Sequence, residues 1–223
     1  MRNRRKIRYK ITAAALISSM LGMSMAGSAL AGPPAVATDE ALYVNLDYYG
    51  NQVDSSVVKG VSLNGLRTFT DYGTYTDVTN MSTYAEPVIS GDGVTWQLPE
   101  DSKERFYYEC QLNNDEVVLP WNFDVSYKLN GIPKEAKDLV HANGLVEMDV
   151  HCIPNENAKE YYRNNMLLQV ATMVNMEDVN AVEAPGSQTQ ALGTYKVVIF
   201  AAVPGEEKTF HIGISTTNFE SMG

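Results

Sequence analysis

Three histidines and two cysteines are the side chains best suited to chemistry in this sequence, and their spacing forms no known catalytic or metal-binding motif. His141, His151 and His211 lie far apart, and no His-x-x-x-His or Cys-x-x-Cys pair occurs. His151 and Cys152 are neighbours, but adjacent residues of a strand point to opposite faces, which argues against a Cys-His dyad. The chain also has no Gly-x-Ser-x-Gly elbow and no P-loop. We therefore assign no catalytic residue, no metal ligand and no cofactor.

Carboxylates are abundant, and a pair of them could support glycoside hydrolysis without leaving a local spacing signature. With 27 acidic residues, pairs that meet by chance are expected. The oxygen-rich stretches 113–116 and 90–93 could contribute to a calcium site, but neither has the ligand order of a known calcium loop. Turn formation explains both stretches, and a hydrolase remains an alternative hypothesis.

The first 37 residues have the pattern of an export signal. Six basic residues lie between Arg2 and Lys10, and residues 11–31 contain no charged side chain. The triplets at 29–31 and 35–37 both satisfy the small-x-small rule of signal peptidase, so we predict a mature start at Gly32 or Thr38. The mature protein is then secreted or associated with the cell surface. Only an uncleaved leader would hold it in a membrane.

Removal of the leader makes the chain strongly acidic. Residues 1–31 hold six of the 17 basic residues and none of the 27 acidic ones, so 11 basic residues and a formal net charge of −16 remain. Proteins bind nucleic acid through clusters of Lys and Arg. We therefore expect no nucleic-acid partner, and the expected partner is a protein or a glycan at the cell surface.

Both cysteines occupy inward positions of predicted strands. In residues 106–112 the alternation places Cys110 on the same face as Phe106 and Tyr108, and in residues 144–152 it places Cys152 with Val146 and Val150. In an exported protein Cys110 and Cys152 could form a disulfide. The alternative is two separate buried thiols.

The remaining mature chain shows apolar residues at every second position, separated by turn residues, and almost no helical periodicity. Asn64-Gly65 and the loop 90–93 have the composition of hairpin turns. Residues 133–143 could form one or two helical turns, and residues 197–203 are apolar on both faces, as in a central strand that is covered on each side. Strands are predicted at residues 42–48, 55–63, 66–72, 88–89, 94–98, 106–112, 121–129, 144–152, 166–174, 179–183, 188–192, 195–203 and 209–216.

This pattern predicts an all-β protein, an antiparallel β-sandwich with at most one short helix. We expect two parts after the signal peptide at 1–37. A small β unit covers residues 38–100, and an immunoglobulin-like sandwich covers residues 104–218. One extended sandwich would give the same pattern.

Tyrosines are the remaining hint of a binding face. The turn-like sequence Asp71-Tyr72-Gly73-Thr74-Tyr75 is expected to be exposed, so Tyr72 and Tyr75 could stack on sugar rings or anchor a protein partner. Packing within strands is the simpler explanation of the 13 tyrosines.

The second part resembles a known group of proteins. The segments Tyr127-Lys128-Leu129-Asn130-Gly131, 133–139 and 144–150, with Asn155 beyond them, resemble the extracytoplasmic β region of Gram-positive surface proteins near the phage-infection-protein group. The resemblance implies a β-rich region that precedes long helical stretches with Leu-x-x-Gly heptads and membrane spans. This chain contains neither, so the resemblance implies a stand-alone secreted relative or part of a larger protein.

The leading hypothesis is an exported, non-enzymatic β-sandwich protein that acts as an interaction domain at the cell surface or envelope. A glycan-binding module that uses exposed tyrosines is the second hypothesis. The hydrolase with a carboxylate pair is the third.

Overall fold

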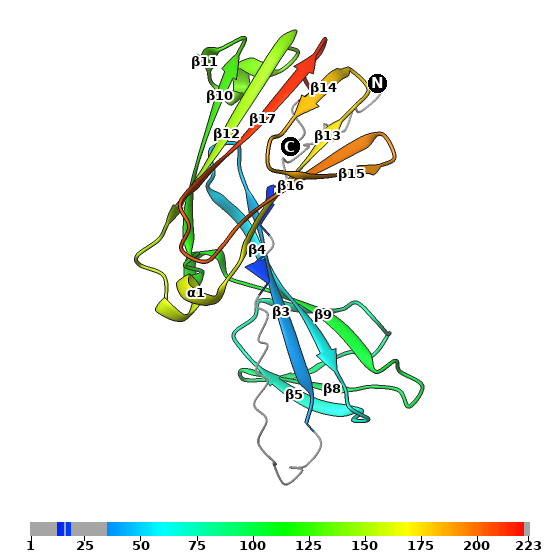
Figure 1. Cartoon of the computed structure of the whole chain (residues 1–223). Helices are drawn as coiled ribbons and strands as arrows, with labels where there is room; N and C mark the ends of the chain where they lie inside the picture. Colours follow the sequence, from blue (N-terminus) through cyan, green and yellow to red (C-terminus); the bar gives the residue numbers. More distant parts are fainter. Residues whose placement is uncertain (1–12, 16, 19–34, 221–223) are drawn as a thin grey trace, which may run out of the picture. The chain divides into compact units, whose positions relative to one another are not determined.

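The computed structural model of the protein describes residues 13–15, 17–18 and 35–220, and it confirms the predicted all-β antiparallel sandwich (Figure 1). Strands make up 56% of the chain and helices 7%, so pairing between strands supplies nearly all of the regular structure. Within the described residues the only α-helix is α1 (Glu160–Asn165). A 3-10 turn at Ala136–Leu139 lies within the stretch predicted to contain helical turns, and another covers Asn114–Glu116.

The described residues divide into two compact units whose boundaries differ from those that the sequence suggested. The larger unit contains residues 13–15, 44–53 and 118–220, and the smaller unit contains 17–18, 35–43 and 54–117. The predicted boundary near residues 99–103 therefore falls inside the smaller unit. The reason is that residues 105–111 pair along their whole length with residues 56–62 and so belong with them.

The larger unit is a sandwich of two antiparallel sheets. Its inner positions form one core that includes Trp121, Val150, Leu168, Phe200 and Phe210 from both sheets, and the rings of Phe200 and Phe210 stack at 4.7 Å. In strand order, the first sheet contains β11 (Ile132–Lys134), β10 (Trp121–Leu129), β12 (Gly144–Pro154), β17 (Lys208–Thr216) and β14 (Val179–Glu183). The second contains β15 (Gln188–Leu192), β16 (Tyr195–Ala202) and β13 (Leu168–Asn175).

The smaller unit also packs two groups of strands around its own core. Trp96 is fully buried there, with its ring centroid 4.9 Å from that of Phe106 and 5.1 Å from that of Tyr108. One sheet contains residues 37–43 of β3 (Ala37–Leu46), residues 54–62 of β4 (Gln52–Ser62), β9 (Arg105–Gln111) and β6 (Asp77–Asn80). The other contains β5 (Thr68–Tyr72), β8 (Gly93–Gln97) and β7 (Val88–Ser90).

Two short strands lie within the predicted leader. β1 (Ala13–Ala15) pairs with β13 and with the end of β3, and β2 (Ile17–Ser18) pairs with β3 at Leu42 and Ala41. The other leader residues up to 34 lie outside the described residues. The signal peptide at 1–37 therefore stays a prediction.

Candidate functional site

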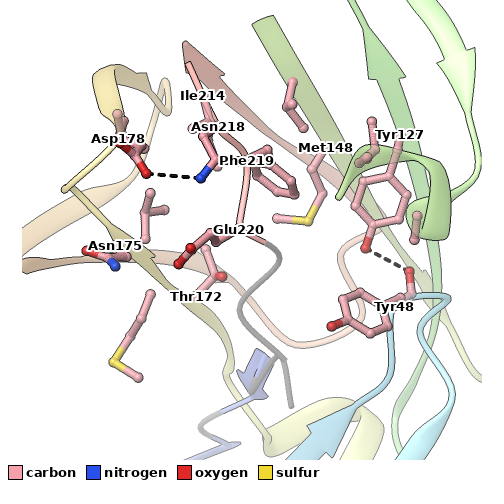
Figure 2. Close-up of a pocket in the computed structure, with 16 residues that line it drawn as sticks. Tyr48, Tyr127, Met148, Thr172, Asn175, Asp178, Ile214, Asn218, Phe219 and Glu220 are labelled. Atoms are coloured by element: carbon pink, nitrogen blue, oxygen red, sulfur yellow. Dashed lines mark hydrogen bonds between the residues drawn. The ribbon is translucent and has the colours of Figure 1, made fainter. Parts of the chain in front are cut away.

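An apolar pocket opens in the larger unit where strands β12 and β17 of one sheet approach β13 of the other (Figure 2). Its cavity has a volume of about 50 Å³, within a wider space of about 730 Å³ that includes open solvent. A space of this size suits one apolar side chain. The lining residues that carry its chemistry are Tyr48, Tyr127, Leu139, Val146, Met148, Asp178, Ile214, Asn218 and Phe219.

The floor of the pocket is apolar and its rim is polar. Leu139 and Val146 are almost fully buried beneath it. On the rim, Asn218 Nδ2 donates a hydrogen bond of 3.2 Å to Asp178 Oδ2. The Tyr127 hydroxyl donates to the Tyr48 carbonyl oxygen at 2.8 Å, and both bonds are drawn in Figure 2. Burial raises the pKa of Tyr127 well above its ordinary value, so this phenol remains a neutral donor.

Beside the pocket, the outer face of the sheet β13–β16–β15 carries a group of apolar side chains, bordered by Gln188 and Gln190, which pair with Ile199 and Val197. Met173 pairs across strands with Val197, and Ala171 pairs with Ile199. Met173 lies between Thr172 and Val174, two residues that line the pocket, so its side chain points to the opposite, outward face of the sheet. The apolar side chains on this face are those of Ala171, Met173, Leu192, Tyr195, Val197 and Ile199, and we refer to them together as the outer apolar face.

The outer apolar face explains why residues 197–203 are apolar on both sides. β16 has a partner on each edge, β13 and β15, as expected for a central strand, but the expected cover on both faces is found only on the inward side. Its inward residues Val198 and Phe200 are buried. On the outward side, however, Met173, Leu192 and Tyr195 keep 43%, 60% and 38% of their surface exposed. Apolar surface that the fold leaves uncovered on a sheet face is typical of an interaction site.

The two tyrosines predicted from the sequence do not form a common platform. Tyr72 is 69% exposed, as expected. Tyr75 is half-buried, and its hydroxyl donates to Asp71 Oδ2 at 3.1 Å. Burial raises the pKa of Tyr75 to about 12. Tyr75 is part of the packing of the smaller unit because its ring lies against the core cluster of that unit.

The two cysteines are both free and buried, and they belong to different cores. Cys110 packs in the smaller unit and Cys152 in the larger unit. The structure therefore contains two separate buried thiols, which was the alternative expectation, and Cys110 and Cys152 form no disulfide with each other. Each side chain points inward, as the alternation predicted, and burial raises the pKa of each thiol to about 12.

Within the described part of the chain, each histidine contacts a different side chain. His141 Nδ1 lies 2.9 Å from Asn218 Oδ1, His151 Nε2 lies 2.9 Å from Glu207 Oε1, and His211 Nδ1 lies 2.7 Å from Asp149 Oδ1. Among the described residues, no three His, Cys, Asp or Glu side chains gather where they could hold a metal ion.

One functional candidate was missed in the sequence analysis. Lys59 is only 5% exposed and lies in the smaller unit between the carboxylates of Glu40 and Asp71. The signal was present in the alternation of Val57, Lys59 and Val61, which puts a lysine at an inward position of a strand.

We compared the chain with known protein families, with curated proteins and with solved structures, and found no match in any of the three. In the part of the chain that the structure describes, no helix has the length and apolar character needed to cross a bilayer.

Proposed function

We propose that this is an exported, non-enzymatic β-sandwich protein that binds a partner protein at the cell surface or envelope. The observation that carries the proposal is the outer apolar face of the larger unit, where Met173, Leu192 and Tyr195 remain exposed. Outward positions of a sandwich sheet are usually polar, so a contiguous apolar group there favours a covered interface.

The pocket lies on the other side of this sheet and is a separate feature, and its size favours an inserted protein side chain over a large ligand. A cavity of about 50 Å³ suits one inserted side chain, as at the centre of many protein interfaces. The polar rim that includes Asp178 and Asn218 would surround such an anchor.

Export is supported by the leader, and a role at the surface is supported by the resemblance of residues 127–155 to Gram-positive surface proteins. Cell fractionation followed by intact mass measurement tests this step. We expect the product outside the cytoplasm, with its N-terminus at Gly32 or Thr38. A purely cytoplasmic product that retains Met1 would contradict it.

Site-specific photo-crosslinking tests the interface. A photoreactive side chain at Met173 reports on the outer apolar face, and the same group at Ile132 is the matched control. Ile132 is an exposed apolar residue of β11, in the other sheet. With envelope extract, we expect a discrete protein adduct at 173 that Leu192→Lys abolishes, and no such adduct at 132. Equal adducts at both positions would contradict the proposal.

Glycan binding remains a second candidate because Tyr72 is exposed. It is tested by retardation in gels that contain cell-wall or dietary polysaccharides. Tyr72→Ala should abolish retardation if this tyrosine stacks on sugar, and unchanged retardation would exclude that site.

A further inference from the structure

The smaller unit contains a buried lysine held between two carboxylates from two other strands. Lys59 Nζ on β4 lies 3.0 and 2.8 Å from the two oxygens of Asp71 on β5, and 2.9 Å from Glu40 Oε1 on β3. Because Nζ is within reach of both Asp71 oxygens, it also lies against the carbon that joins them. The side chain of Lys59 is 6% exposed and that of Asp71 is 19% exposed.

The contact between Lys59 and Asp71 joins the two sheets of the smaller unit, since β4 and β5 belong to different sheets. Aromatic side chains surround it. Tyr108, the residue opposite Lys59 on β9, is fully buried, and Tyr75 donates to Asp71. The ring of Tyr75 lies 5.3 Å from the Lys59 nitrogen.

A buried ion pair costs free energy, because both charged groups lose their hydration. An amide between the same two side chains would be neutral and would avoid that cost. Fixed neighbours also react as if at very high concentration. The burial of the amine and carboxyl groups limits the water available for the reverse reaction.

We propose that Lys59 and Asp71 condense to an intramolecular amide that links β4 to β5, with Glu40 as the proton carrier. The Lys59 ammonium gives up a proton, and the free amine attacks Cγ of Asp71. A C–N bond forms, one C–O bond of the carboxyl group breaks, and the departing oxygen leaves as water after receiving two protons from the former ammonium group. Ammonium and carboxylate become amide and water, so no oxidant, reductant or further reactant is needed.

Glu40 is placed to carry these protons. Its carboxylate contacts the reacting nitrogen directly, and its side chain is 51% exposed, which gives the released water a route to solvent. Burial alone lowers the pKa of the Lys59 ammonium, but the bonds to Asp71, Tyr75 and Glu40 outweigh burial and raise that pKa above its ordinary value. Free amine is therefore scarce and the reaction is slow, but it has to occur only once in each molecule.

Mass spectrometry of the purified, denatured protein tests the proposal. We expect a mass one water lighter than the sequence of the same mature chain. Trypsin should not cut after Lys59, so the peptide that ends at Arg67 should remain covalently attached to the peptide 68–103. A chain of full mass that trypsin cuts after Lys59 would overturn the proposal. So would a lost water that maps to Asp92-Gly93, where an aspartate can dehydrate alone.

Variants at neighbouring carboxylates test the role of Glu40. Glu40→Gln keeps the size of a half-exposed side chain and should leave the chain unlinked at full mass. The matched control is Asp39→Asn, the adjacent residue of β3, whose carboxylate pairs with Arg105 instead. This control should remain one water lighter, as should Glu104→Gln, which removes a surface partner of Arg67. Linked Glu40→Gln protein, or loss of the link in Asp39→Asn protein that is folded by circular dichroism, would overturn the assignment of Glu40.

Discussion

At the scale of single residues, burial decides what a reactive side chain can do. Cys110 and Cys152 are the only two thiols of the chain, and each is enclosed by apolar neighbours in a separate core. Because the thiolate and not the thiol is the nucleophile, a raised pKa and lack of access both suppress reactivity.

We therefore predict that the native protein reacts very slowly with a thiol reagent at pH 8, and that both thiols react at once in denaturant. The pKa of each thiol is about 12 in the folded protein, against an ordinary value near 9. The unfolded chain thus loses these protons first as pH rises, so their contribution to stability declines above about pH 9. Rapid labelling of one native cysteine would contradict the buried placement.

Tyr72 and Tyr75 differ in burial, although they are only three residues apart in the sequence. Tyr72→Ala should change the free energy of unfolding by less than about 0.5 kcal/mol, as is usual for exposed positions. Tyr75→Phe removes a hydroxyl bonded to Asp71 and should cost about 1 kcal/mol or more. Urea unfolding of the two variants measures the difference, and equal losses would contradict the placement of Tyr75.

At the scale of elements, turns depend on backbone conformations that glycine adopts at low cost. Gly50 and Gly91 both have positive φ, at 90° and 60°. A Cβ added at Gly91 would meet nothing, whereas one at Gly50 would collide with the backbone carbonyl of Phe123.

This difference gives a matched pair of substitutions. Gly91→Ala should cost about 1 to 2 kcal/mol, the usual penalty of a left-handed conformation. Gly50→Ala carries the same penalty and must also displace the β10 backbone, so its loss should be clearly greater. Thermal unfolding checks the order, and a Gly50→Ala variant as stable as Gly91→Ala would contradict the close approach to Phe123.

Individual strands were predictable because alternation and turn residues are local signals. β14 and β15 have the bounds that the sequence predicted, and the loop 90–93 joins β7 to β8 as a hairpin. At Asn64-Gly65 the turn forms, with both residues at positive φ, but the strands it connects do not pair. β4 pairs instead with β9, and β5 pairs with β8. These strands are far apart in the sequence, so the few residues of the turn carry no information about their pairing.

The candidate site was less predictable for the same reason. The pocket draws its walls from β12, β13, β17 and residue Tyr48, which are distant in the sequence. The apolar character of residues 197–203 was visible, but the sequence could not show that its outward side would stay exposed. Lys59 could have been found from its inward position, whereas its pairing with Asp71 and Glu40 depends on three different strands.

At the scale of the whole molecule, the two units have separate cores and each core contains one tryptophan. Trp96 is fully buried in the smaller unit, and Trp121 is buried in the larger unit, where its indole nitrogen donates to the Glu206 carbonyl at 2.9 Å. The chain has no other tryptophan.

Each tryptophan therefore reports on the unfolding of one unit. We predict that Trp121→Phe protein, which retains Trp96, and Trp96→Phe protein, which retains Trp121, unfold with different midpoints when followed by fluorescence in urea. Circular dichroism of each variant is the control, because it should show both transitions. Coincident fluorescence and dichroism midpoints in both variants would mean that the two cores unfold as one cooperative unit.

The division of the chain also fixes the order in which a growing polypeptide can complete each core. The larger unit uses residues 44–53, but its remaining strands come only after residue 117. Every described residue of the smaller unit has been synthesised by that point, whereas β12 can pair with β17 only after residue 216 has been added. The smaller unit can therefore be complete on the ribosome first, while residues 44–53 lack their partner strands until those of the larger unit have been synthesised.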